Sequence, residues 1–295
     1  MPDKAHRVID ERLEKLEKRL SSFYLAAGVE LQKKSDAYFK QFEKQDKAKR
    51  KDVSDGKLTE REYKQWRKNT MMGKTTFTAF KRSIAAILFA KNEEATKMVV
   101  KELSYAYAEG HNQLGVSTID AANVLSARGG VPFPVYEVDK SRDMAWNEKK
   151  IDAIVLSGIV AGLSLSSIGK IAPRLVSQNL SAMVRNARTT VTAAENKGRI
   201  DSYIEAEDEG YKVQKKWVAI LDGRTRHAHE ELNGKVQDVN KPFVNSSGEI
   251  WWPGDPSSAP ANRMNCRCHL VPLVDGKETI KLKTPRKTTR LTEDV

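Results

Sequence analysis

Apolar residues recur at steps of three and four through most of the first two hundred residues, and this spacing restricts the chain to packed helices. The first stripe consists of Ile9, Leu13, Leu16, Leu20 and Phe23. It lasts about two heptads, so it predicts a helix packed on another helix rather than a long coiled coil. A turn at Asp55-Gly56 precedes the next predicted helix, for which Thr59 and Glu62 form a capping box.

Two further helical blocks follow. The first has an apolar stripe made of Phe77, Phe80, Ile84, Ile87 and Leu88. After it, residues 126–143 contain a glycine pair and two prolines, which break helices. The second block runs from about residue 147 to 207 and contains an uncharged run at 153–169. That run is rich in Ser and Gly, so we expect a buried helix pair with a tight turn rather than a membrane span.

The pattern changes at Tyr211 to alternation with a period of two, which predicts strands. Residues 211–221 read as a strand, followed by a turn and a short helix that ends at Asn233-Gly234. Residues 249–256 read as a strand that ends in a Pro-Gly turn, and residues 266–274 as the closing strand. The predicted fold is mainly α, with a multi-helix N-terminal body and a small C-terminal α+β unit. The expected division is a charged helical region at 1–70, a helical body at 71–208, the α+β unit at 209–275 and a basic flexible tail at 276–295.

The composition limits the classes of function. Lys and Arg exceed Asp and Glu by 51 to 39 among 295 residues, a net charge of +12. Such a surplus permits non-specific contact with double-stranded DNA or another acidic surface. The two cysteines form no disulfide framework, which indicates a reducing compartment, and the N-terminus lacks the apolar segment of a secretory signal.

Both cysteines lie in "NRMNCRCHLVPLV", residues 262–274, one residue apart. A disulfide between Cys266 and Cys268 would close a very small, strained ring. In an extended segment, however, residues i and i+2 point to the same side. The two thiols therefore form either half of a metal site or a pair of small buried apolar groups.

The C-terminal part resembles the Mu protein F-like phage head morphogenesis family, the minor head (minor capsid) proteins of tailed double-stranded DNA bacteriophages. The resemblance covers about residues 174–274. It rests on the ordered set Arg188, Thr189, Asn196, Trp217, Asp222, Arg224, Thr225, Arg226, His229, Leu232, Gly234, Asn265, Cys266, Arg267 and Cys268. Two positions depart from the family pattern: Thr190 stands where an acidic residue is common, and His227 is an added histidine.

Within this set, His229, Cys266, Cys268 and Asp222 make a plausible tetrahedral zinc site. His269 is a weaker candidate, because it lies on the opposite strand face from the cysteines. The alternative is that Asp222 caps the short helix, Arg224 and Arg226 pair with carboxylates, and the thiols pack as apolar groups.

Three classes of function compete. The resemblance implies a structural component of the phage head that docks at the portal vertex, with portal, capsid and scaffold proteins as partners. It would act in capsid assembly, DNA packaging or DNA ejection, in the host cytoplasm during assembly and then in the procapsid and virion. The second class is a metal-dependent hydrolase or nuclease built on Asp222, His229, Cys266 and Cys268. The third is a plain DNA-binding protein, for which no recognition motif is evident. We favour the first, a non-enzyme.

Overall fold

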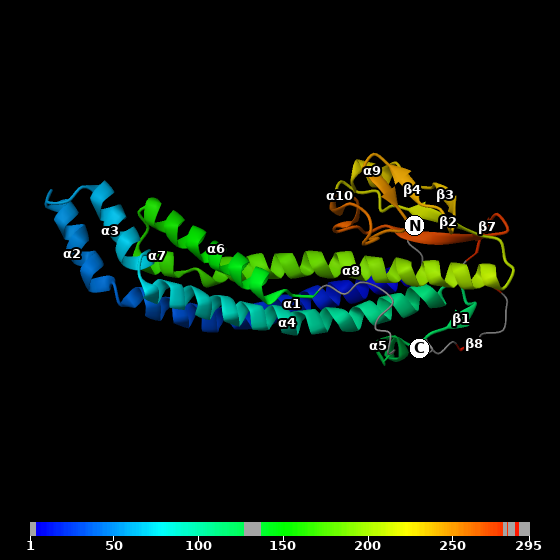
Figure 1. The fold of residues 1–295 in the computed structure, drawn as a ribbon, viewed down its shortest axis with the longest axis horizontal. Helices are drawn as coiled ribbons and strands as arrows, with labels where there is room; N and C mark the ends of the chain where they lie inside the picture. The colour runs from blue at the N-terminus through cyan, green and yellow to red at the C-terminus, as the bar shows by residue number, and fades with distance from the viewer. Residues whose placement is uncertain (1–3, 127–136, 280–281, 283–286, 289–295) are drawn as a thin grey trace. The chain divides into compact units, whose positions relative to one another are not determined.

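The computed structural model describes residues 4–126, 137–279, 282 and 287–288 (Figure 1). The helices are α1 (Lys4–Lys40), α2 (Glu43–Ser54), α3 (Glu60–Met72), α4 (Thr75–Asn112), α5 (Ala121–Ser126), α6 (Lys140–Val160), α7 (Leu165–Gly169), α8 (Ala172–Asp208), α9 (His227–Glu230) and α10 (Pro260–Arg263). The strands are β1 (Ser117–Thr118), β2 (Val213–Val218), β3 (Val236–Asp238), β4 (Phe243–Asn245), β5 (Gly248–Ile250), β6 (His269–Val274), β7 (Lys277–Glu278) and β8 (Lys287–Thr288). The predicted fold class, a helical body with a small C-terminal α+β unit, is confirmed.

The chain divides into two compact units that do not follow chain order. Unit 1 comprises Met1–Lys18, Thr96–Tyr136 and Val184–Val295, and unit 2 comprises Arg19–Ala95 and Glu137–Met183. This differs from the four consecutive regions expected from the sequence. The physical reason is that each of the long helices α1, α4 and α8 has one part in unit 1 and the other part in unit 2.

Unit 2 consists of helices that pack through aromatic side chains and a buried ion pair. Tyr38 stacks on Phe80 with ring centroids 4.4 Å apart. A buried ion pair joins α3 to α2, where the Arg67 guanidinium donates to both oxygens of Asp46 at 2.8 and 3.2 Å. The same guanidinium donates to the backbone oxygen of Leu163 at 2.6 Å, so it also fixes the turn between α6 and α7.

Unit 1 contains a four-stranded antiparallel sheet in the order β3-β2-β6-β7, which lies along the C-terminal part of α8 (Figure 1). Strand β2 alternates between buried and partly buried residues, as its sequence predicts. The buried face of the sheet packs on α8 in a core that includes Trp217, Leu270, Ile200 and both cysteines. The cysteines are therefore core residues.

In unit 1, the backbones of α4 and α8 approach each other closely. A Cβ on Gly198 would lie 2.1 Å from the backbone oxygen of Tyr107, and a Cβ on Gly110 would lie 2.1 Å from that of Glu195. Only glycine fits at these two positions, because any side chain would overlap the neighbouring helix. The crossing holds the polar face of α8 at a fixed place under the sheet.

Several local predictions are confirmed. Thr59 and Glu62 form the capping box of α3. The run 153–169 does turn, at Gly162 with φ +70° between α6 and α7. It is not fully buried, however, since Leu156 and Val160 are 37% and 62% exposed.

Other boundaries are corrected. The strand expected at the start of 249–256 is β5, which ends at Ile250 because the two tryptophans that follow already bend the chain, and the expected Pro-Gly turn comes next at 253–254. The closing strand begins at His269 instead of Cys266. Of the expected flexible tail, Lys287–Thr288 pairs in parallel with β1 and Leu282 donates to the Leu114 backbone oxygen at 2.8 Å. Most of that tail, and residues 127–136 of the irregular stretch, lie outside the described residues.

A buried charged group connects the first turns of α1 to α8. Both oxygens of Glu195 lie 2.9–3.0 Å from Nδ1 of His6, and Arg199 donates to Glu195 at 2.7 Å. Burial by itself would raise the pKa of Glu195, but the charges of His6 and Arg199 lower it to about 2. Burial by itself would lower the pKa of His6, but Glu195 outweighs burial and raises it. The ring of His6 also stacks on His269 at 4.2 Å.

These shifts predict how the stability of unit 1 depends on pH. The contribution of Glu195 is present above its ordinary pKa of 4.5 and is lost as the pH falls toward 2. The contribution of His6 is complete below pH 6.5 and is lost as the pH rises through its raised pKa. The cluster therefore stabilises most between these two values. Glu195→Gln should flatten this pH dependence and, by leaving Arg199 without its buried counter-charge, lower the free energy of unfolding by about 3–5 kcal/mol.

Urea denaturation at a series of pH values measures both effects. Glu17→Gln is the control, because the Glu17–Arg188 pair is part-exposed and its loss should cost at most about 1 kcal/mol. Equal losses for the two variants would contradict the assignment.

Candidate metal centre

One polar face of α8 positions the segment that carries the cysteines. Thr189 and Thr192, three residues apart on the helix, are both buried. The hydroxyl oxygen of Thr189 accepts a hydrogen bond from the backbone N–H of Asn265 at 2.8 Å, and the hydroxyl of Thr192 donates to the backbone oxygen of Cys266 at 2.8 Å. Asn265 has φ 55°, a left-handed conformation that Asn adopts more readily than most residues. The chain can therefore turn sharply just before the first thiol.

The same face continues one and two turns further along α8. The side chain of Asn196 accepts from the backbone N–H of Leu270 at 2.9 Å and donates to the backbone oxygen of Cys268 at 3.3 Å. Arg199 donates to the backbone oxygen of Leu270 at 2.8 Å. The helix thus binds the backbone of residues 265–270 through four side chains, which satisfies polar groups that burial would otherwise leave without partners.

The two thiols lie in the extended segment just before β6. This corrects the prediction that they lie within the closing strand. The predicted consequence is still found, since both side chains project to one side of the segment and both are buried, at 2% and 3% exposure for Cys266 and Cys268. Both are free cysteines, so the strained disulfide is not formed.

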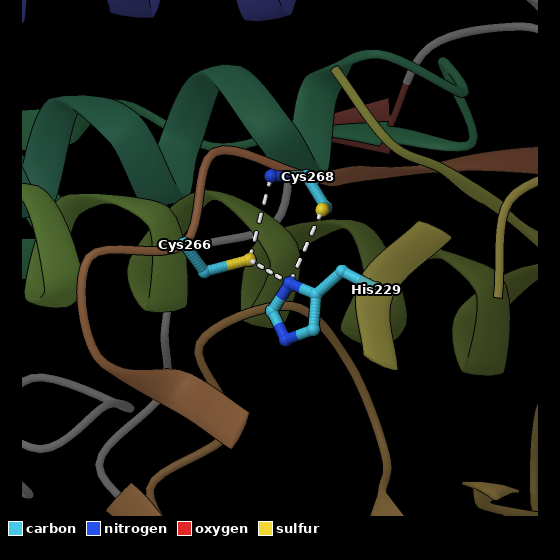
Figure 2. A group of neighbouring side chains, drawn as sticks. All are labelled: His229, Cys266 and Cys268. Carbon is cyan, nitrogen blue, oxygen red and sulfur yellow. Dashed lines mark hydrogen bonds between the residues drawn. The ribbon is translucent and has the colours of Figure 1, made fainter. Parts of the chain in front are cut away.

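His229 reaches the thiols from α9. This helix begins at His227, because the preceding residues form a turn around the Asp222 carboxylate. Nδ1 of His229 lies 3.5 Å from Sγ of Cys266 and 3.5 Å from Sγ of Cys268, and Figure 2 shows this nitrogen directed at both sulfurs. His227, two residues earlier, is 85% exposed and points elsewhere.

A hydrogen bond at Nε2, the ring nitrogen that does not face the thiols, fixes the tautomer of His229. Nε2 lies 2.7 Å from the backbone oxygen of Asn262 on α10. A carbonyl oxygen only accepts, so Nε2 carries the proton and, in the neutral ring, Nδ1 presents a lone pair to the sulfurs. The ring is held edge-on to Trp217, with centroids 5.6 Å apart.

The pKa values of the three side chains shift in different directions. Burial raises the pKa of Cys266 well above its usual value, and the nearby Cys268 raises it further. The hydrogen bond from Cys266 lowers the pKa of Cys268 against the effect of burial. Burial would lower the pKa of His229, but its contact with Cys266 and the Asn262 carbonyl together raise it.

Asp222 takes a different position from the one expected. Its carboxylate accepts two hydrogen bonds from the Arg267 guanidinium at 2.6 and 2.7 Å, and one from the backbone N–H of Arg224 at 3.0 Å. These contacts hold its pKa well below the usual range. Among the described residues, His229, Cys266 and Cys268 have ligand atoms within 4.8 Å of one another, and Asp222 is not part of that group. Asp222 instead ties the turn before α9 to the thiol segment.

The remaining motif residues support this arrangement structurally. The side chains of Trp217 and Leu232 are fully buried, and Gly234, at φ +80°, donates its N–H to the Trp217 backbone oxygen at 2.8 Å. Other contacts are those of Arg188 with Glu17 at 2.7 Å, of Arg226 with the Met264 backbone oxygen, of Thr225 with the Ile220 backbone oxygen, and of Arg224 with Asp222 at 3.3 Å. Arg226 therefore binds a carbonyl and not the expected carboxylate.

Sequence reasoning missed three residues that shape the site. Thr192 and Arg199 bind the thiol segment, and Asn262 orients His229. A signal for the first two exists in hindsight: Thr189, Thr192, Asn196 and Arg199 recur at steps of three, four and three, which places polar residues on one helical face in a segment otherwise rich in alanine. Asn262 acts through its backbone, so no pattern of side chains could identify it.

A known family model matches the part of the chain that contains this site. Residues 149–271 match the model of the family described as Phage Mu protein F like protein. This region of the chain is therefore similar to that family. The matched span contains the polar face of α8, the histidine and both cysteines.

Two curated relatives match. The chain is 28% identical to "Minor head protein GP7" of Bacillus phage SPP1 over 177 residues, which are 59% of this chain and 56% of the relative. It is 30% identical to "NAD(+)--arginine ADP-ribosyltransferase EFV" of Enterococcus faecalis (strain ATCC 700802 / V583) over 122 residues, which are 41% of this chain and 25% of that protein. The chain thus spans about half and a quarter of the lengths of these relatives. No solved structure matches it.

The hydrogen bonds of α8 predict the effect of a single substitution. Asn196→Ala removes the amide that bonds to the backbone oxygen of Cys268 and to the backbone N–H of Leu270. Each of these buried groups, left without its partner, should lower the free energy of unfolding by about 1–3 kcal/mol. Urea denaturation followed by tryptophan fluorescence measures the loss. Thr190→Ala is the matched control, since among the described residues the Thr190 hydroxyl bonds to carbonyls of its own helix, at Asn186 and Ala187. A loss for Asn196→Ala no larger than for the control would argue against this role of the helix face.

Proposed function

We propose that the chain is a minor head protein of a tailed double-stranded DNA bacteriophage. It acts as a structural and interaction component at the portal vertex, in capsid assembly, DNA packaging or DNA ejection. It is in the host cytoplasm during assembly and then in the procapsid and virion, with portal, capsid and scaffold proteins as partners. The observation that carries this proposal is the similarity to Minor head protein GP7, which extends over 59% of the chain.

The surface of unit 2 is suited to binding another protein. Helix α6 exposes a stripe at one face, made of Trp146, Ala153, Leu156 and Val160. Steps of seven, three and four place these side chains on the same side of the helix. An exposed apolar stripe of this kind is typical of a protein interface. We assign it to docking on the portal oligomer.

A metal-dependent hydrolase is the weaker candidate. General base catalysis needs a carboxylate or imidazole free to take a proton from water. The Asp222 carboxylate is engaged by Arg267, and Nε2 of His229 is engaged by the Asn262 carbonyl. The side chains proposed for catalysis therefore already have structural partners. The activity in the name of the Enterococcus faecalis relative is not assigned to this chain, because the match covers only a quarter of that protein.

Contact with double-stranded DNA is supported by the charge of helix α2. Lys44, Lys47 and Lys51 are exposed at steps of three and four, on one face of this helix. A lysine face of this kind binds phosphates without reading sequence.

In the described part of the chain no helix is both long and apolar enough to span a bilayer.

The docking proposal predicts the behaviour of a surface variant. Val160→Lys combined with Leu156→Lys puts charge on the α6 stripe and should abolish co-purification with the portal protein of the same phage, while the wild type co-purifies at micromolar concentration and low salt. Both positions are exposed, so the fold should be retained, which circular dichroism checks. Ser181→Lys adds charge at an exposed position of α8 in the same unit and should leave binding intact. A wild-type chain that migrates apart from the portal would contradict the proposal.

The DNA proposal predicts strong dependence on salt. The affinity for double-stranded DNA should fall steeply between 50 and 200 mM salt and should not depend on sequence. Replacing Lys44, Lys47 and Lys51 by Ala should reduce the slope of log K against log salt by roughly 0.9 for each phosphate that is no longer neutralised. Replacing all three by Arg keeps the charge and should keep the slope. Fluorescence anisotropy with a labelled duplex measures both, and a sequence-selective, salt-insensitive complex would overturn the proposal.

A further inference from the structure

We propose that His229, Cys266 and Cys268 bind one zinc ion, and that this ion is structural: it fastens helix α9 to the thiol segment that lies on α8. The zinc site concerns only unit 1 and does not depend on the proposed role in the phage head. Three features of the molecule support it: the spacing of the three ligand atoms, the groups that orient them, and the donors that surround them.

The spacing of the donor atoms matches a tetrahedral zinc site. Zinc–sulfur bonds of about 2.3 Å and zinc–nitrogen bonds of about 2.0–2.1 Å at the tetrahedral angle separate N from S by about 3.5 Å. Nδ1 of His229 lies at 3.5 Å from each of the two sulfurs. All three atoms lie within 4.8 Å of one another, so a single ion can reach them with little adjustment (Figure 2).

The imidazole is oriented as a metal ligand requires. Histidines that bind metals commonly donate their other N–H to a carbonyl or carboxylate, which fixes the ring and the tautomer. The backbone oxygen of Asn262 receives this bond from Nε2 at 2.7 Å, so the Nδ1 lone pair faces the thiols. That lone pair can accept only one S–H proton, although two sulfurs lie at the same distance from it. One cation that binds all three atoms satisfies this arrangement better than a shared proton does.

The sulfurs are surrounded by N–H groups, which stabilise thiolates. The backbone N–H of Cys268 lies 3.4 Å from Sγ of Cys266. The backbone N–H of Ile220 and the indole N–H of Trp217 act on Cys268, and both favour its thiolate. Trp217 is fully buried, and its indole N–H has no hydrogen-bond partner among the described residues. Such donors around two buried sulfurs suit a pair of thiolates bound to a cation.

Two thiolates and one imidazole favour zinc among the divalent ions of a reducing compartment. Two thiolates also neutralise its charge, so the site can be buried. A small pocket beside the three ligands, lined in part by Arg224, Thr225 and Arg226, provides space for a water molecule as the fourth ligand. Because Asp222 is held by Arg267, that water has no carboxylate base beside it within the described residues, which agrees with a structural role.

The decisive measurement is the metal content of the full-length wild type. Protein expressed with added zinc, then desalted, should contain about one zinc per chain by inductively coupled plasma mass spectrometry. Titration with a mercurial reagent should release that zinc as the two thiols react. Protein refolded with Co²⁺ should show the thiolate-to-cobalt charge-transfer band and the intense visible bands of a tetrahedral site. Folded wild type that retains no zinc, and gives no such bands with Co²⁺, would overturn the proposal.

Variants assign the ligands. Cys266→Ser, Cys268→Ser and His229→Ala should each lower the retained zinc at least tenfold. His227→Ala is the matched control, since this histidine lies two residues from His229 on the same short helix, yet is 85% exposed and outside the group of three ligand atoms. It should retain the full zinc content. Zinc that is lost with His227→Ala but kept in the cysteine variants would place the metal elsewhere and refute the assignment.

Discussion

The C-terminal half of the molecule depends on the hydrogen bonds that the polar face of α8 makes. Thr189, Thr192, Asn196 and Arg199 bind backbone groups of residues 265–270 inside a core where water cannot compete. A buried amide or carbonyl without a partner costs a large fraction of the stability of a small protein unit. The helix therefore determines where the thiols lie and where β6 starts. Through β6, it also determines the register of β2, since Val218 pairs with His269.

The sequence was informative where a pattern repeats. Helical stripes, the alternation of β2 and the Thr59–Glu62 capping box each involve local physics, and all are found in the structure. It was less informative where one tertiary contact decides the outcome. Asp222 looks like a fourth ligand by its place in the motif, but the guanidinium of Arg267, the residue between the two cysteines, binds both of its oxygens. Likewise, the thiols precede β6 because side chains of α8, not a neighbouring strand, donate hydrogen bonds to the backbone oxygens of both cysteines.

The two units present different chemistry. Unit 1 holds the histidine, the thiols and the α8 face, all within the span that matches the phage family. Unit 2 holds the exposed apolar stripe of α6 and the lysine face of α2. The motif residues of unit 1 thus maintain a fold, whereas the surfaces proposed for partners lie on amphipathic helices that carry no such motif. This explains why the sequence indicated the family more clearly than it indicated the partners.

The order of segments in the units has a consequence for synthesis on the ribosome. Every residue of unit 2 lies between Arg19 and Met183, so its contacts can form while the rest of the chain is still being made. Unit 1 cannot be completed then, because His6 must meet Glu195, 189 residues later in the chain, and His269 after that. The first turns of α1 must wait for the last strands to emerge. Synthesis arrested before β6 would leave the apolar core residues of β2 and α8 without the strand that packs beside them, which makes truncated chains of this protein natural targets for chaperones and proteases.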